Sequence, residues 1–100
     1  MEQKPTNMDT ISQWREEIHG YWMEIQQFES REDIEFILRR LSAFAARAGY
    51  MHSVTVRSSN KNVSDFRTKE VDKFLAAVEF QFKIWSRVAS VGQTEWEMTR

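Results

Sequence analysis

Histidine, carboxylate and arginine side chains are the residues of this chain with the most obvious chemistry. The two histidines, His19 and His52, are far apart, and neither has another His or a Cys three or four residues away. A zinc site needs three or four converging ligands, so this spacing predicts no metal site. Glu16 lies one helical turn before His19, where the two side chains would pair on a solvated helix surface. We therefore expect neither a metal ion nor another cofactor.

The carboxylates and hydroxyls likewise form no catalytic pattern. The adjacent pairs Glu16–Glu17 and Glu32–Asp33 suit helix surfaces and first turns, and nothing nearby predicts that either pair is buried for acid–base work. The sequence has no cysteine, its three glycines are isolated, and no serine follows the nucleophile-elbow pattern. We predict that the protein is not an enzyme. A small helical enzyme whose site forms across a dimer interface stays open as a further alternative.

A modest group of basic residues is the feature that favours nucleic acid as a partner. Its members are Arg39, Arg40, Arg47, Arg57, Lys61 and Arg67. The last three lie among serines and asparagines, as phosphate-contacting side chains often do. The formal net charge is −1, however, so no overall field attracts a polyanion. Nucleic-acid binding by these residues is kept as the alternative to an ordinary solvated surface.

The composition predicts one small globular domain. Charged residues make up 29% and apolar residues 41%, which is typical of a folded chain, and 100 residues leave room for one core. We expect a single domain over 1–100, with flexible ends at 1–9 and 93–100. No apolar run approaches the roughly 18 residues of a membrane span, and the first residues lack a secretory pattern. A cytoplasmic protein without a membrane partner is the expectation.

Apolar residues at helical spacing predict three helices, over about 10–28, 31–48 and 66–91. The first stripe is spaced 3-4-3-4-3 from Ile11 to Phe28, and the second runs from Ile34 to Ala48. Gly49 and Gly92 stand where a glycine commonly ends a helix. Between them, residues 50–65 are expected to be extended or to form a short strand. The predicted fold is an all-α, three-helix bundle.

The third helix contains a segment, Glu79 to Trp85, whose apolar residues alternate as in a strand. A helix accounts for more of the surrounding sequence, since nothing from Thr68 to Val91 signals a turn. On that helix Phe82 and Trp85 share the inward side with Val78, whereas a second apolar strip is left over. The residues expected on this second surface are Phe80, Ile84, Val88 and Val91, together with Phe36, which lies off the stripe of the second helix.

The excess of aromatic residues completes the functional expectation. Aromatic residues make up 13% of the chain, with four Trp and seven Phe, which is more than a core of this size needs. Large apolar residues outside the core commonly anchor protein–protein interfaces. We predict a small regulatory, adaptor or inhibitor protein that binds another protein through this helical surface and itself forms a homodimer.

Overall fold

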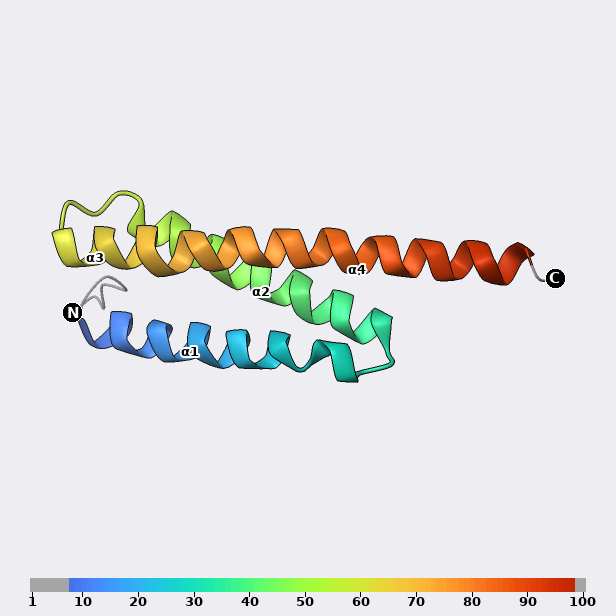
Figure 1. The fold of residues 1–100 in the computed structure, drawn as a ribbon. Helices are drawn as coiled ribbons and strands as arrows, with labels where there is room; N and C mark the ends of the chain where they lie inside the picture. Colours follow the sequence, from blue (N-terminus) through green and yellow to red (C-terminus); the bar gives the residue numbers. More distant parts are fainter. Residues whose placement is uncertain (1–7, 99–100) are drawn as a thin grey trace.

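The computed structural model describes residues 8–98 and confirms the all-α, three-helix bundle (Figure 1). Its elements are α1 (Met8–Gln26), a single 3-10 turn η1 (Phe28–Ser30), α2 (Ile34–Thr55), α3 (Lys61–Phe66), a π-helical turn η2 (Arg67–Val71) and α4 (Asp72–Met98). Since α3, η2 and α4 follow one another without a break, they form the third rod of the bundle. The described residues contain no strand, and the segment from Glu79 to Trp85 is helical, as predicted.

The connection between α1 and α2 is short and capped. The Asp33 carboxylate accepts a 3.0 Å hydrogen bond from the backbone N–H of Phe36, so Asp33 caps the start of α2. The Ser30 hydroxyl instead donates to the Gln27 carbonyl, and α2 therefore begins three residues later than predicted. The Asp33 cap is the reason for this shift.

The prediction of an extended or short-strand connection over 50–65 was wrong. α2 continues through Gly49 to Thr55, and Gly49 does not have the positive φ of a helix-ending glycine. The buried stripe of α2 continues with Met51 and Thr55, and the Thr55 hydroxyl donates to the Met51 carbonyl. Burying one more turn outweighs the roughly 1 kcal/mol that a glycine costs in a helix. The real connection is the short segment 56–60.

The third rod begins earlier than predicted because Asn60 caps it. The Asn60 side chain accepts from the backbone N–H groups of Asn62 and Val63, at 2.8 and 3.3 Å. Val63 and Phe66 then bury themselves against the other helices. The segment that the sequence leaves as a linker is thus the first part of the bundle's longest rod.

The π-helical turn η2 corrects the register of this rod. The buried residues Val63, Phe66, Val71, Phe74 and Val78 are spaced 3-5-3-4. In a regular α-helix a five-residue step would turn Val71 well away from Phe66. A π-turn accommodates one additional residue, so both side chains face the core. η2 is therefore a packing feature as well as an irregularity.

The core is rich in stacked aromatic rings drawn from all three rods. Tyr21 of α1 stacks on Phe44 of α2 with ring centroids 4.4 Å apart, and Phe74 of α4 lies 6.0 Å from Phe44. Trp22 meets Phe74 edge-on at 5.4 Å. Such ring pairs add specific geometry to the apolar area that they bury. A large share of the aromatic residues is thus used inside the bundle.

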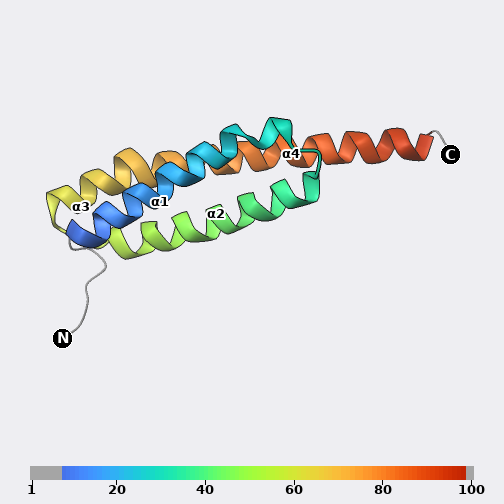
Figure 2. The same ribbon diagram turned by 90° about the horizontal axis from the view of Figure 1, so that it is seen from below.

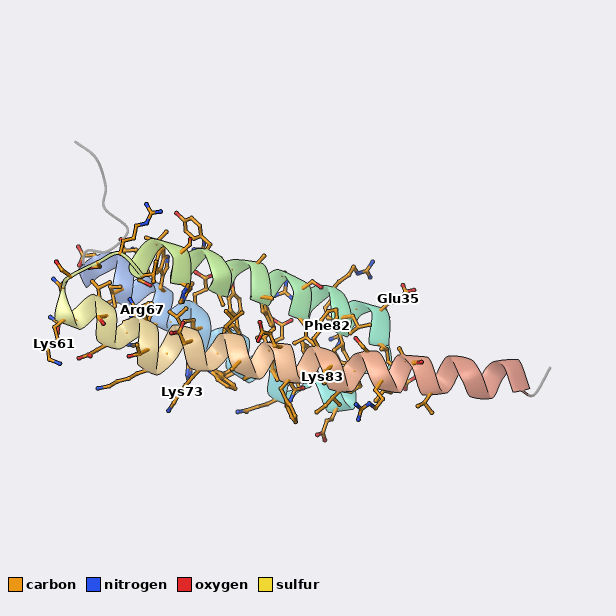
Figure 3. The ribbon with its side chains drawn as sticks, turned by 90° about the horizontal axis from the view of Figure 1, so that it is seen from above. Glu35, Lys61, Arg67, Lys73, Phe82 and Lys83 are labelled. Atoms are coloured by element: carbon orange, nitrogen blue, oxygen red, sulfur yellow. The ribbon has the colours of Figure 1, made fainter. Side chains whose placement is uncertain are left out.

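The end of the third rod differs from the prediction in two ways. Gly92 does not end it, because α4 continues to Met98. Phe82, predicted to be buried, is 38% exposed, since it lies on the side of α4 that faces the very start of α2, near Glu35 (Figure 3). The expected flexible ends fall partly on 1–7 and 99–100, which lie outside the described residues. Residues 8, 9 and 93–98 are helical.

Candidate interaction surface

The most distinctive feature of the molecule is that α4 extends past the other two helices. α1 and α2 are joined near the middle of α4, and its C-terminal half projects beyond that connection (Figure 1). Figure 2 shows the same projection from a second side. The molecule is accordingly 61 Å long but only 24 by 21 Å across. Trp85 is half-buried and, among the described apolar residues, is the last one on α4 that packs on the core. The thirteen positions from 86 to 98 would span about 20 Å.

A strip of exposed apolar side chains runs from the bundle onto this projection. Phe80 is 62% exposed, Ile84 38%, Val88 41% and Val91 51%. Helical geometry places these four residues within about 80° of arc on α4. We call Phe80, Ile84, Val88 and Val91 the α4 strip. They are residues that the sequence pattern assigned to a second apolar surface, and each of them is exposed in the structure.

A groove connects the α4 strip with the end of the bundle. Its inner part is a hollow of about 340 Å³ between the end of α1 and α4, with Ile25 and Phe28 on one side and Trp85 on the other. Its outer part lies on the projection and is lined by Ile84, Arg87, Val88 and Val91. Ile84 borders both hollows, so they lie next to each other along α4. Together they offer apolar walls along more than two turns of α4.

Phe36 lies apart from the α4 strip in the fold, although the sequence grouped it with these residues. It is on the first turn of α2 and is half-buried. The guanidinium of Arg31 covers its ring at 4.1 Å from the centroid, which is the geometry of a cation–π contact. Phe36 therefore already has a partner within the chain. Its role in binding stays a prediction.

The basic residues predicted as a nucleic-acid site are largely engaged within the bundle. Arg40 forms a two-pronged ion pair with Glu24, with Nε–Oε2 and Nη2–Oε1 distances of 2.7 and 3.1 Å. Arg47 pairs in the same way with Glu17, at 2.6 and 3.2 Å. These pairs join α2 to α1 and neutralise the charge that a phosphate would need.

The remaining basic residues of that group differ in their contacts. Arg67 donates to the Thr55 carbonyl at 3.0 Å, and Lys61 lies 3.4 Å from the Asp65 carboxylate. Arg39 and Arg57 are exposed. Four of the six basic residues thus have partners within the bundle, and the binding of nucleic acid by this group stays an untested prediction.

Burial and hydrogen bonding shift the pKa values of Tyr21 and Glu17, which contact each other beside these pairs. Burial and then the Glu17 carboxylate, which accepts its hydrogen bond, raise the pKa of the Tyr21 hydroxyl to about 12. Burial by itself raises the pKa of the Glu17 carboxyl, but hydrogen bonds from Arg47 and Tyr21 outweigh it and leave that pKa lowered. This is the pattern of a structural network, because every member already has its partner.

The histidines form no metal site. His52, predicted to lie in a loop, is within α2, and its Nδ1 lies 2.8 Å from the Asp72 carboxylate at the start of α4. Sequence reasoning missed this pair because it depends on how two helices pack. His19 is exposed on α1 and lines a shallow polar cleft next to η2. Within residues 8–98 no three metal-binding side chains gather closely enough to hold an ion.

Comparisons with family models, curated proteins and solved structures found no match to this chain, so no relative's activity bears on its function. None of the helices that the structure describes has the length and apolar character needed to span a membrane. The α4 strip and the hollows beside it are the candidate interaction surface of the described residues.

Proposed function

We propose that the chain is a small protein-binding module, of the regulatory, adaptor or inhibitor kind, that docks a partner on the α4 strip. The observation that carries this proposal is the concentration of exposed apolar residues on one helix. Of the eight large apolar side chains that are exposed among the described residues, five belong to α4: Phe80, Phe82, Ile84, Val88 and Val91. Single exposed apolar residues are ordinary on protein surfaces, but a contiguous strip is not.

The position of the strip supports the proposal as well. An amphipathic helix typically contacts its partner through apolar side chains repeated at three- and four-residue spacing, which is the spacing of the α4 strip. Phe80 and Ile84 are large enough to act as anchors, and the groove beside Ile84 gives a partner side chain an apolar pocket. Protein binding therefore uses features that the bundle itself does not need.

The projecting part of α4 would also gain helix stability from a partner. The projection extends a helix that the bundle already holds, so its stability rests on propagation alone, which gains little per residue in water. Among the described apolar residues packed on the core, Trp85 is the last on α4, and the helix projects beyond the connection between α1 and α2 (Figure 1). Packing against a partner would supply the missing tertiary support. A second copy of the chain in that place, forming a homodimer, is the other form of this proposal.

Affinity capture from an extract of the source organism tests this function. The wild-type chain is compared with a Phe80→Glu plus Ile84→Glu variant and with Met23→Glu, a matched control on α1 whose side chain is 50% exposed. We expect the wild type and the control to retain the same specific protein, and the double variant to lose it while remaining helical. Equal retention by all three proteins would contradict binding through the α4 strip.

A further inference from the structure

We propose that the occupant of the α4 strip is an amphipathic helix with an acidic edge, supplied by a different protein. This inference rests on the proposed function and names the chemistry of the partner. It begins with charge: residues 80–91 contain two cations, Lys83 and Arg87, and no carboxylate. The exposed Glu79 lies one turn before Lys83, so this predominantly apolar docking surface has an edge with two cations and one carboxylate at its bundle end.

The two cations of this edge are not used inside the chain. Lys83 and Arg87 are both exposed and take part in none of the ion pairs found among the described residues. The interhelical arginines differ, since Arg15, Arg40 and Arg47 each pair with a glutamate. Lys83, like Lys73, points away from α2 (Figure 3). Arg39 and Arg57 are also exposed and take no part in those ion pairs, but Lys83 and Arg87 are two cations that stand beside the α4 strip.

Arg87 is part of the docking surface rather than only next to it. It lines the outer groove together with Ile84, Val88 and Val91. A partner that covers these three residues also removes water from the guanidinium. A desolvated arginine without a counter-ion is costly, whereas one that meets a carboxylate forms a strong charge-assisted hydrogen bond. The surface therefore favours a partner that places an acidic side chain beside an apolar one.

A second copy of the chain satisfies this requirement poorly. Two α4 strips packed face to face would bring Lys83 and Arg87 against residues 80–91 of the other copy, which carry no carboxylate. Like charges across an interface and an unpaired buried arginine both weaken such a complex. A separate acidic helix avoids both costs. The inner groove also fixes its orientation, because Glu29 borders the α1 side, so the acidic edge should face Lys83 and Arg87.

Binding of two synthetic helical peptides to the full chain tests the inference. Each peptide has about 18 residues, enough to span roughly 27 Å as a helix, and a leucine stripe at three- and four-residue spacing. One has glutamates along the edge of the stripe and the other has lysines at the same positions. We expect the acidic peptide to bind at least about fivefold more tightly, which is the effect of two ion pairs even where they stay exposed, and this preference to shrink at high salt. The Lys83→Glu plus Arg87→Glu variant should reverse the preference.

The outcomes separate this inference from the proposed function. If neither peptide binds, or if both bind equally, the acidic-helix inference is overturned, while capture that depends on Phe80 and Ile84 leaves the proposed function standing. The wild-type chain could instead show twice the monomer mass in solution, with the Phe80→Glu plus Ile84→Glu variant showing the monomer mass. That result would overturn the acidic-helix inference in favour of a second copy of the chain. Strip-dependent binding to vesicles containing phosphatidylserine, but not to the acidic peptide, would overturn it in favour of a membrane surface.

Discussion

Truncating Phe80 distinguishes a true surface strip from core residues that are covered in solution. Phe80 is 62% exposed, which leaves about 38% of its side chain buried. Full burial of a phenylalanine contributes roughly 1.5–3 kcal/mol, so Phe80→Ala should cost about 1 kcal/mol of unfolding free energy or less. Phe74 is 0% exposed and touches Trp22 and Phe44, so Phe74→Ala should cost roughly 3–5 kcal/mol.

The assay is urea unfolding followed by helical circular dichroism, at two protein concentrations that differ by a large factor. Phe74→Leu serves as a milder core control in case Phe74→Ala does not fold. For a monomer the unfolding midpoint is the same at both concentrations, whereas for a homodimer it rises with concentration. If Phe80→Ala costs as much as Phe74→Ala at both concentrations, Phe80 is buried within the monomer, and the α4 strip is not a surface.

Three further predictions test the fold and the electrostatics. Gly49→Ala should raise the free energy of unfolding by roughly 0.5–1 kcal/mol, because Gly49 lies inside α2 and an added Cβ meets nothing within 4 Å. A loss of stability would contradict a helix that continues through this residue. In a Tyr50→Phe variant, the tyrosinate absorbance should report a pKa of about 12 for Tyr21. Since the folded state holds this proton more tightly than the unfolded state, the free energy of unfolding should fall as the pH rises from about 10 to that value. A titration midpoint near 10 would show that the Glu17 hydrogen bond is absent in solution. Titration with duplex and single-stranded DNA at two salt concentrations should show no salt-sensitive binding, because Arg40 and Arg47 are paired with glutamates. If the chain does bind DNA, and an Arg39→Ala plus Arg57→Ala variant binds it more weakly, a nucleic-acid site would be favoured.

Helical periodicity was enough to predict the fold class and most of the core. The stripe from Ile11 to Phe28 is spaced regularly, and five of its six predicted positions are buried, with Tyr21 half-buried against Phe44. Each such position reports only which side of its own helix faces the core. That information is local, so a single sequence contains it.

The errors lie where the outcome depends on packing between distant residues. Gly49 is a common helix end by local preference, but burial of Met51 and Thr55 carries α2 past it. The step from Phe66 to Val71 breaks the helical spacing, and this irregularity is itself the sequence signal of the π-turn. A search for a five-residue step between two regular stripes would have found the start of the third rod.

The candidate site was predictable in its residues but not in its setting. Periodicity placed Phe80 and Ile84 opposite the core, and they are exposed. It could not show that α4 extends past the ends of α1 and α2. Where each helix ends relative to the others depends on how the connections between them pack. For the same reason Phe82 was predicted to be buried, although α2 only begins beside it. The pairing of Arg40 with Glu24, sixteen residues away, likewise follows from helix packing.

Photo-crosslinking from within the α4 strip tests the central claim most directly. A benzophenone-bearing phenylalanine replaces Val88, which is 41% exposed, and in a control replaces Met23 on α1. After irradiation in cells of the source organism, we expect a discrete adduct with another protein from position 88 and none from position 23. Equal labelling from both positions, or a crosslink from position 88 only within the same chain, would contradict the proposal that the α4 strip binds a protein partner.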